Sequence, residues 1–171
     1  MKTAVIVILA WICLTAPAAK AASSTPSGAQ AATLAHWLAR NPNYRVATEA
    51  DCACSDDIHD MRTSGPWGDP IRDYEPYVLV GDFRKNGQLD LAVVVTLVRL
   101  REPGNGVLLI FDGPFRASAK QPAFVGRVGS LAHTGLFLAK ESGYPIFGAF
   151  FSEGCLFRPR HQTYVKDCGS F

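Results

Sequence analysis

Histidine is the side chain best suited to acid–base chemistry near neutral pH, and the sequence has four, His36, His59, His133 and His161. None stands beside an obvious nucleophile, and the sequence contains no Gly-x-Ser-x-Gly elbow, phosphate-cradling glycine loop or His-Glu-x-x-His motif. The arrangement closest to a hydrolase sets His133 near Ser130, with Glu141 or Glu153 as the acid. Because catalytic triads assemble in space rather than along the chain, a hydrolase centred on His133 is an alternative, although the sequence assigns no catalytic residue.

Carboxylates form two further groups. Asp69 and Asp73 could act as the paired acids of a glycoside hydrolase, but they lie in a predicted loop that fixes no separation between them. Asp56, Asp57 and Asp60 are explained more simply as the solvated N-terminal face of a helix, because carboxylates favour the positive end of the helix dipole. Neither group therefore establishes an enzyme.

The cysteines indicate disulfide bonds. Once the N-terminal segment described below is removed, four remain, Cys52, Cys54, Cys155 and Cys168, and an even number in an exported chain predicts two disulfides. A ring between Cys52 and Cys54 would be strained, so we expect each to bond with one of the two C-terminal cysteines and close a loop of about 100 residues. A metal site built from Cys52, Cys54 and His59 is the alternative, although its spacing matches no standard zinc pattern.

Residues 1–21 have the features of a secretory signal peptide. Lys2 supplies a short positive region and residues 4–14 are apolar. Both Ala16-x-Ala18 and Ala19-x-Ala21 fit the small-x-small cleavage pattern. The apolar run is shorter than the roughly 20 residues that span a bilayer, so we expect cleavage after Ala21 and no stable membrane insertion. An uncleaved anchor is the alternative. The predicted location is periplasmic or extracellular, with residues 22–30 as a flexible lead-in.

Composition limits the class of protein. The 171-residue chain is 48% hydrophobic and 19% charged, which is typical of one compact domain and argues against a disordered chain or a coiled coil. Loss of Lys2 and Lys20 with the signal leaves 15 basic residues against 15 acidic ones, so the mature protein is formally neutral. No basic stripe is visible, and a nucleic-acid partner is therefore not expected. We expect the partner to be a protein or a component of the envelope.

Hydrophobic periodicity predicts helices first and strands afterwards. Helices are expected at residues 31–40 and 55–61, with Ser55 as the cap of the second and a short strand at 44–48 between them. After a loop at 64–76, strands are expected at 77–83, 89–100, 107–111, 124–128, 135–139 and 146–151, and as a hairpin of 155–157 with 163–166. Residues 89–100 are apolar on both faces, which places that strand in the middle of a covered sheet. The predicted fold is α+β, with two N-terminal helices packed on a mainly antiparallel sheet in a single domain, residues 31–171.

One stretch, residues 77–94, resembles a known motif. The calcium loop of FG-GAP or VCBS repeats runs Gly-Asp-x-Asn-x-Asp-Gly-x-x-Asp before an apolar strand. Asp82, Gly87 and Asp90 stand at its first acidic position, its second glycine and its last acidic position, and Asn86 replaces the middle aspartate, which keeps an oxygen but loses a charge. The resemblance implies a calcium site with oxygen ligands from Asp82, Asn86 and Asp90. Arg84 departs from the motif by adding a positive charge, and it could itself neutralise Asp82 or Asp90. The alternative is a plain β-hairpin turned at Asn86-Gly87.

The loop at residues 64–76 is the predicted partner-binding surface. Trp67 lies between small residues that offer it little to pack against, and aromatic side chains on rigid loops make good anchors for proteins or sugars. We therefore predict partner contacts at Trp67, Asp69 and Tyr74, with the alternative that Trp67 folds back over the core. The predicted function is a small exported binding protein stapled by disulfides. A calcium-stabilised domain and a hydrolase are the alternatives.

Overall fold

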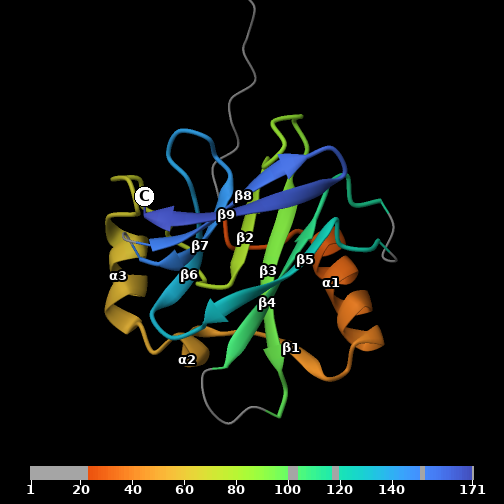
Figure 1. Cartoon of the computed structure of the whole chain (residues 1–171), viewed down its shortest axis with the longest axis horizontal. Coiled ribbons are helices and arrows are strands. Elements are labelled where there is room, and N and C mark those ends of the chain that lie inside the picture. The colour runs from red at the N-terminus through yellow and green to blue at the C-terminus, as the bar shows by residue number, and fades with distance from the viewer. Residues whose placement is uncertain (1–22, 100–103, 117–119, 151–152, 171) are drawn as a thin grey trace, which may run out of the picture.

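The computed structural model describes residues 23–99, 104–116, 120–150 and 153–170 (Figure 1). In chain order the elements are α1 (Gly28–Arg40), β1 (Tyr44–Val46), α2 (Glu49–Cys52), α3 (Ser55–Thr63), β2 (Val78–Gly81), β3 (Asp90–Leu97), β4 (Asn105–Phe111), β5 (Phe124–Ser130), β6 (Thr134–Leu138), β7 (Pro145–Ala149), β8 (Glu153–Arg160) and β9 (Thr163–Ser170). The predicted signal peptide, residues 1–21, lies outside the described residues.

The strands form two antiparallel sheets. In the first sheet β3 is central: β1 and β2 both pair along one side of it, β4 pairs along the other, and β5 follows β4. The second sheet has the order β6-β7-β8-β9. The predicted α+β fold is confirmed, with two sheets where we expected one.

Two hydrophobic cores explain why β3 is apolar on both faces from Leu91 to Val95. Successive side chains of a strand point to opposite faces, so Leu91, Val93 and Val95 pack with α1 on one side of the sheet. Ala92 and Val94 point the other way, into a larger core shared with the second sheet, α2 and α3. Figure 1 shows α1 and α3 on opposite sides of the sheets. The prediction that this strand is covered on both faces is therefore confirmed.

The start of α1 and the cap of α3 differ from those predicted, whereas α3 begins at Ser55, the first residue of the predicted helix. α1 starts at Gly28, three residues early, because Ser27 and Gln30 form a capping box in which each side chain bonds the backbone N–H of the other residue. Cys54 rather than Ser55 is the N-cap of α3, so the predicted Ser55 cap is wrong. α2 was not predicted, because four residues are too few to show a helical period.

The expected flexible lead-in is held in place along its described part, residues 23–30. Ser23 pairs with Val80 on β2, and its backbone N–H and C=O both bond that residue. The Asp73 carboxylate accepts hydrogen bonds from Ser23 Oγ at 2.6 Å, from the Ser24 N–H at 3.2 Å and from Thr25 Oγ1 at 2.7 Å. The described part of this segment is therefore bonded to β2 and to Asp73 rather than detached from the fold.

The second sheet meets the first at strand β5. Thr163 Oγ1 donates to the carbonyl of Ala123 at 3.1 Å, and Lys166 Nζ donates to the carbonyl of Arg127 at 3.2 Å. The rings of Phe124 and Phe157 pack edge-on with centroids 5.4 Å apart. These contacts fix the β8–β9 hairpin beside β5.

Candidate functional site

An open cleft of about 540 Å³ lies where the end of β5 meets the ends of β7 and β9 and the starts of β6 and β8. Four of its lining residues are glycines, Gly129, Gly148, Gly154 and Gly169. The side chains used in the argument below are those of Ser130, Thr134, Phe147, Glu153, Cys155 and Cys168. Because glycine carries no side chain, much of the cleft wall is bare backbone.

The glycines play two different parts in this wall. A Cβ added to Gly148 would lie 2.1 Å from the carbonyl oxygen of Glu153 and 2.3 Å from the Cα of Gly154, so β7 and β8 approach closely only because both residues are glycine. A Cβ added to Gly129 or Gly169 would meet nothing within 4 Å. Larger side chains at Gly129 or Gly169 would therefore enter open space at the cleft wall without displacing the strands.

A disulfide between Cys155 and Cys168 forms part of the cleft wall. The two residues are directly opposite in the β8–β9 pair, with Cα atoms 4.0 Å apart. Cys168 is exposed and Cys155 is half-buried. The predicted pairing of each N-terminal cysteine with a C-terminal one is wrong.

The other disulfide joins Cys52 to Cys54, whose Cα atoms are 5.1 Å apart. Ala53 between them has a left-handed backbone with φ of 52°, which turns the chain so that both sulfur atoms lie on the same side. The two cysteines are buried, at 0% and 4% exposure. The alternative metal site with His59 is also wrong, because both sulfurs are bonded to each other.

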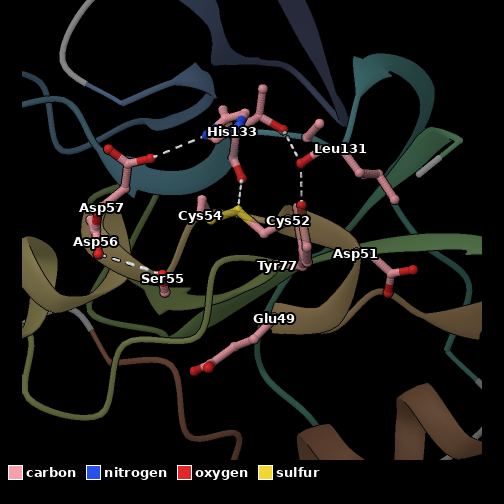
Figure 2. Close-up of a disulfide and its surroundings, with 12 residues drawn as sticks. Glu49, Asp51, Cys52, Cys54, Ser55, Asp56, Asp57, Tyr77, Leu131 and His133 are labelled. Carbon is pink, nitrogen blue, oxygen red and sulfur yellow. Dashed lines mark hydrogen bonds and ion pairs between the residues drawn. A yellow bond between two sulfur atoms is a disulfide. The ribbon is translucent and has the colours of Figure 1, made fainter. Parts of the chain in front are cut away.

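The buried disulfide anchors the turn between β5 and β6. The Cys52 carbonyl accepts a hydrogen bond from the His133 N–H at 2.8 Å, and the Thr134 carbonyl oxygen lies 3.4 Å from Cys52 Sγ. Tyr77 donates its hydroxyl to the Leu131 carbonyl in the same turn. Figure 2 shows His133 beside the disulfide, with its ring directed toward Asp57. This junction places α3 next to the start of β6, which lines the cleft.

The residues proposed for a hydrolase, His133, Ser130 and the two glutamates, do not contact one another as a catalytic triad would. His133 Nδ1 lies 3.7 Å from the Asp57 carboxylate, and the His133 side chain is 70% exposed. Ser130 lines the cleft, where its Oγ accepts a hydrogen bond from the Ala132 N–H at 3.1 Å. Glu153 lines the same cleft, whereas Glu141 lies in the turn at the far end of β6. The structure thus brings Ser130 and Glu153 together and pairs His133 with an aspartate that the sequence did not suggest.

The predicted partner loop is folded against the core. Trp67 Nε1 donates to the Leu138 carbonyl at 2.7 Å, and its ring packs edge-on against Phe137, so the alternative that Trp67 covers the core is what the structure shows. Tyr74 has no exposed surface and lies beside the ring of Phe150. A partner contact at Tyr74 is therefore a wrong prediction, because no partner can reach it. Asp69 is exposed.

The loop with the calcium-loop resemblance closes the β2–β3 hairpin. The Asp82 carboxylate accepts from the backbone N–H groups of Asn86 at 2.9 Å and Gly87 at 2.7 Å. Asn86 Oδ1 accepts from the N–H of Gln88 at 3.0 Å. Two of the three proposed ligands thus already bond amides of their own loop. Residues 82–89 do close a β-hairpin, but with an eight-residue loop between the paired Gly81 and Asp90 rather than a tight turn at Asn86-Gly87.

Asp90, the third proposed ligand, is paired with Arg84. The Arg84 guanidinium lies 3.0 Å from Asp90 Oδ1, 3.0 Å from Asp112 Oδ2 and 2.8 Å from the carbonyl oxygen of Gly113. Asp90 also accepts from the N–H of Gly113 at 2.7 Å. Burial raises the pKa of Asp90, against the lowering effect of the hydrogen bonds from Gly113 and Arg84. Arg84 therefore neutralises Asp90, which is one of the two carboxylates, Asp82 and Asp90, that the sequence analysis named as its possible partners.

An acidic surface extends from α2 through α3 to the following loop. Residues 49–75 carry eight acidic side chains and two basic ones, a formal excess of six negative charges. Arg45 pairs with Asp51, and Arg62 pairs with two glutamates. Among the described residues no ion pair involves the exposed carboxylates of Asp56, Asp60 and Asp69. We call residues 49–75 the acidic surface; the Asp57–His133 contact joins it to the turn between β5 and β6.

Comparison with known proteins adds no relative: no family model, curated protein or solved structure matches this chain. Within the residues that the structure describes, no helix is long and apolar enough to cross a membrane. In the same part of the chain, no group of three or more His, Cys, Asp or Glu side chains is placed to hold a metal ion.

Proposed function

We propose that this chain is an exported, disulfide-stabilised binding protein and that its cleft receives a positively charged segment of a protein partner. The observation that carries this proposal is the cleft itself. Its volume of about 540 Å³ lies within the range of roughly 300 to 1,000 Å³ that ligand sites occupy. Four glycines in the lining leave flat surface within reach of an incoming chain.

The chemistry of the lining favours binding over catalysis. Thr134 Oγ1 donates to the carbonyls of Ser130 and Leu131, at 2.8 and 3.0 Å, and Ser130 Oγ is engaged by the Ala132 N–H. Neither hydroxyl contacts a histidine in the described structure, so neither has the base that activates a nucleophile. Glu153 is the ionisable side chain among the lining residues.

The charge around the cleft favours a cationic partner. Glu153 lines it, and the acidic surface continues from Asp57 along α3. Fields of one sign steer oppositely charged partners toward a surface and give the association a strong dependence on salt. A basic segment would gain both this attraction and contacts inside the cleft.

Export rests on two independent features. The predicted signal peptide directs the chain out of the cytoplasm, and both pairs of cysteines in the mature sequence are disulfide-bonded. Disulfides persist in oxidising compartments, such as the periplasm or the extracellular space.

The test compares capture by the processed wild-type protein with capture by two variants. Gly129→Phe adds a large side chain at the cleft wall, whereas Val125→Phe changes an exposed side chain of the same strand that does not line the cleft. Each protein is immobilised and exposed to an envelope extract of the source cells, then washed with increasing salt. We expect a basic protein to bind the wild type and Val125→Phe, to be lost from Gly129→Phe and to elute at high salt. Equal capture by both variants would contradict the cleft as the binding site.

A second comparison tests the charge. Glu153→Gln keeps the shape of the side chain and removes its negative charge, and Glu141→Gln makes the same change at the far end of β6. We expect the first substitution to weaken binding of the captured protein by about tenfold, which corresponds to about 1.4 kcal/mol. The second should leave the affinity unchanged. If the captured protein is acidic, or if neither substitution changes its affinity, the proposal that the cleft binds a positively charged segment would be wrong.

A further inference from the structure

The two disulfides differ in how solvent reaches them. Cys52 and Cys54 are 0% and 4% exposed and lie in the larger core. Cys155 and Cys168 both line the open cleft, and Cys168 is exposed. A thiol can attack a disulfide only where it can approach a sulfur atom. The cleft therefore gives access to one disulfide and not to the other.

We infer that Cys168 is a thiol-exchange site, at which a small thiol enters the cleft and attacks Sγ. In this step the incoming thiolate forms a bond to Cys168 Sγ, the bond between the two protein sulfurs breaks, and Cys155 leaves as a thiolate that takes up a proton. The product is a mixed disulfide on Cys168 and a free thiol on Cys155. Cys168 is the sulfur attacked because it is exposed, whereas Cys155 is half-buried. The inference does not depend on the proposed partner.

The β8–β9 hairpin makes this exchange reversible. Eight residue pairs join the two strands, from Glu153 opposite Ser170 to Arg160 opposite Thr163. The ladder holds Cys155 opposite Cys168 even when their bond is open. The Cys155 thiolate can therefore attack Cys168 Sγ in the mixed disulfide and release the small thiol, which restores the original bond.

Helix geometry does not reverse this preference. Cys54 is the N-cap of α3, and a cysteine at a helix N-terminus gains thiolate character once it is reduced. This increase in thiolate character exists only after the disulfide has been reduced. Attack on the intact disulfide requires that a thiol reach one of its sulfur atoms, and both Cys52 and Cys54 are buried. Exchange is therefore expected to be selective for the cleft disulfide in the folded protein.

The test incubates the folded, oxidised protein with reduced glutathione at mildly alkaline pH, stops the reaction with a thiol-alkylating reagent at intervals and maps the modified peptides by mass spectrometry. We expect glutathione on Cys168 and the alkyl group on Cys155, appearing at least about tenfold faster than any label on Cys52 or Cys54. Equal rates at the two disulfides, or glutathione found on Cys155, would overturn the inference.

A cleft-filling variant separates entry through the cleft from general unfolding. Gly129→Phe should slow the exchange by about tenfold, because access governs the rate, while Val125→Phe should react like the wild type. Gly169→Phe takes the place of Gly129→Phe if circular dichroism shows that the latter does not fold. Exchange at the wild-type rate in a folded cleft-filling variant would show that the thiol does not enter through the cleft, and the assignment would fail.

Discussion

The guanidinium of Arg84 lies 3.0 Å from the carboxylate of Asp90, a side chain with no exposed surface. The same guanidinium reaches Asp112, which in turn accepts a hydrogen bond from the Tyr164 hydroxyl at 3.0 Å. One cation thus links the β2–β3 hairpin to the segment after β4 and to the second sheet. A buried carboxylate needs such a partner, because an unpaired charge in the interior is costly.

Removing the cation should therefore destabilise the fold strongly. We expect Arg84→Ala to lower the free energy of unfolding by about 3–5 kcal/mol, since it leaves Asp90 buried and unpaired. Lys85→Ala removes an exposed positive charge from the same loop, with its contact to the Tyr144 ring at 5.7 Å, and should lower stability by about 1 kcal/mol or less. Urea denaturation of both variants measures the difference. Equal effects would mean that the Arg84–Asp90 pair contributes nothing specific.

Calcium provides a separate test of the same loop. Because Arg84 already supplies positive charge to Asp90, we expect the melting temperature of the wild type to be the same in excess calcium and in chelator. Arg84→Asn replaces the guanidinium with a neutral side chain whose oxygen can bind calcium. Calcium at about 100 times its dissociation constant would then raise the free energy of unfolding by roughly 2.7 kcal/mol. Arg84→Asn/Asp90→Asn is the control that should lose this gain. A calcium-dependent rise in the wild type that disappears in Asp82→Asn would instead support the calcium-stabilised domain.

Acid should weaken the contact between Arg45 and Asp51. The hydrogen bond from Arg45 lowers the pKa of Asp51, so the folded state releases this proton more readily than the unfolded chain does. The stabilisation is complete above the unfolded value of about 3.9 and is lost as pH falls through the lowered folded value. Arg45 is partly exposed, so we expect a loss of about 1 kcal/mol or less.

Denaturation curves between pH 6 and pH 2, taken for wild type and Asp51→Asn, measure this loss. The variant should be less stable than wild type at pH 6 and should approach it in strong acid. Asp69→Asn is the matched control, because Asp69 is exposed and has no ion pair among the described residues. A constant difference between wild type and Asp51→Asn at every pH would show that charge at Asp51 plays no part.

Substitution by alanine should destabilise the protein strongly at one glycine of the cleft and hardly at all at another. Gly148→Ala places a methyl group 2.1 Å from a backbone oxygen. We expect this overpacking to lower the free energy of unfolding by about 1–3 kcal/mol or more. Gly169→Ala places the methyl group in open space, and its effect should be within about 0.5 kcal/mol. Thermal melting of the two variants gives the comparison. Similar melting temperatures would mean that β7 and β8 can separate without cost.

Elements with a strong local pattern could be predicted from the sequence. The apolar run that became β3 carries its own evidence of burial on both faces, and the β8–β9 hairpin follows from its alternation. Arg84 and Asp90 were also recognised as a possible pair, because they lie close together in a short loop. In each case the relevant neighbours are close in sequence.

Features that depend on distant neighbours could not be predicted. The cleft is built from the ends of five strands, and its glycines carry no pattern of their own. The burial of Tyr74 depends on Phe150 and on the second sheet. The disulfide pairing was within reach, however: a turn between Arg160 and Thr163 sets Cys155 opposite Cys168 by counting back along both strands. For Cys52 and Cys54, the left-handed backbone at Ala53 was the missing information.

The pairing of Ser23 with Val80 has a consequence for self-association. β2 shares one of its sides with β3, and on its other side the backbone groups of Val80 are taken up by Ser23, which the Asp73 carboxylate holds in place. An uncovered strand edge is a template on which a second copy of the chain can add, and this is a route to aggregation. Ser23 therefore protects the free edge of β2 from pairing with another molecule. A protein trimmed to begin at α1 would fold with this edge exposed to other copies of the chain.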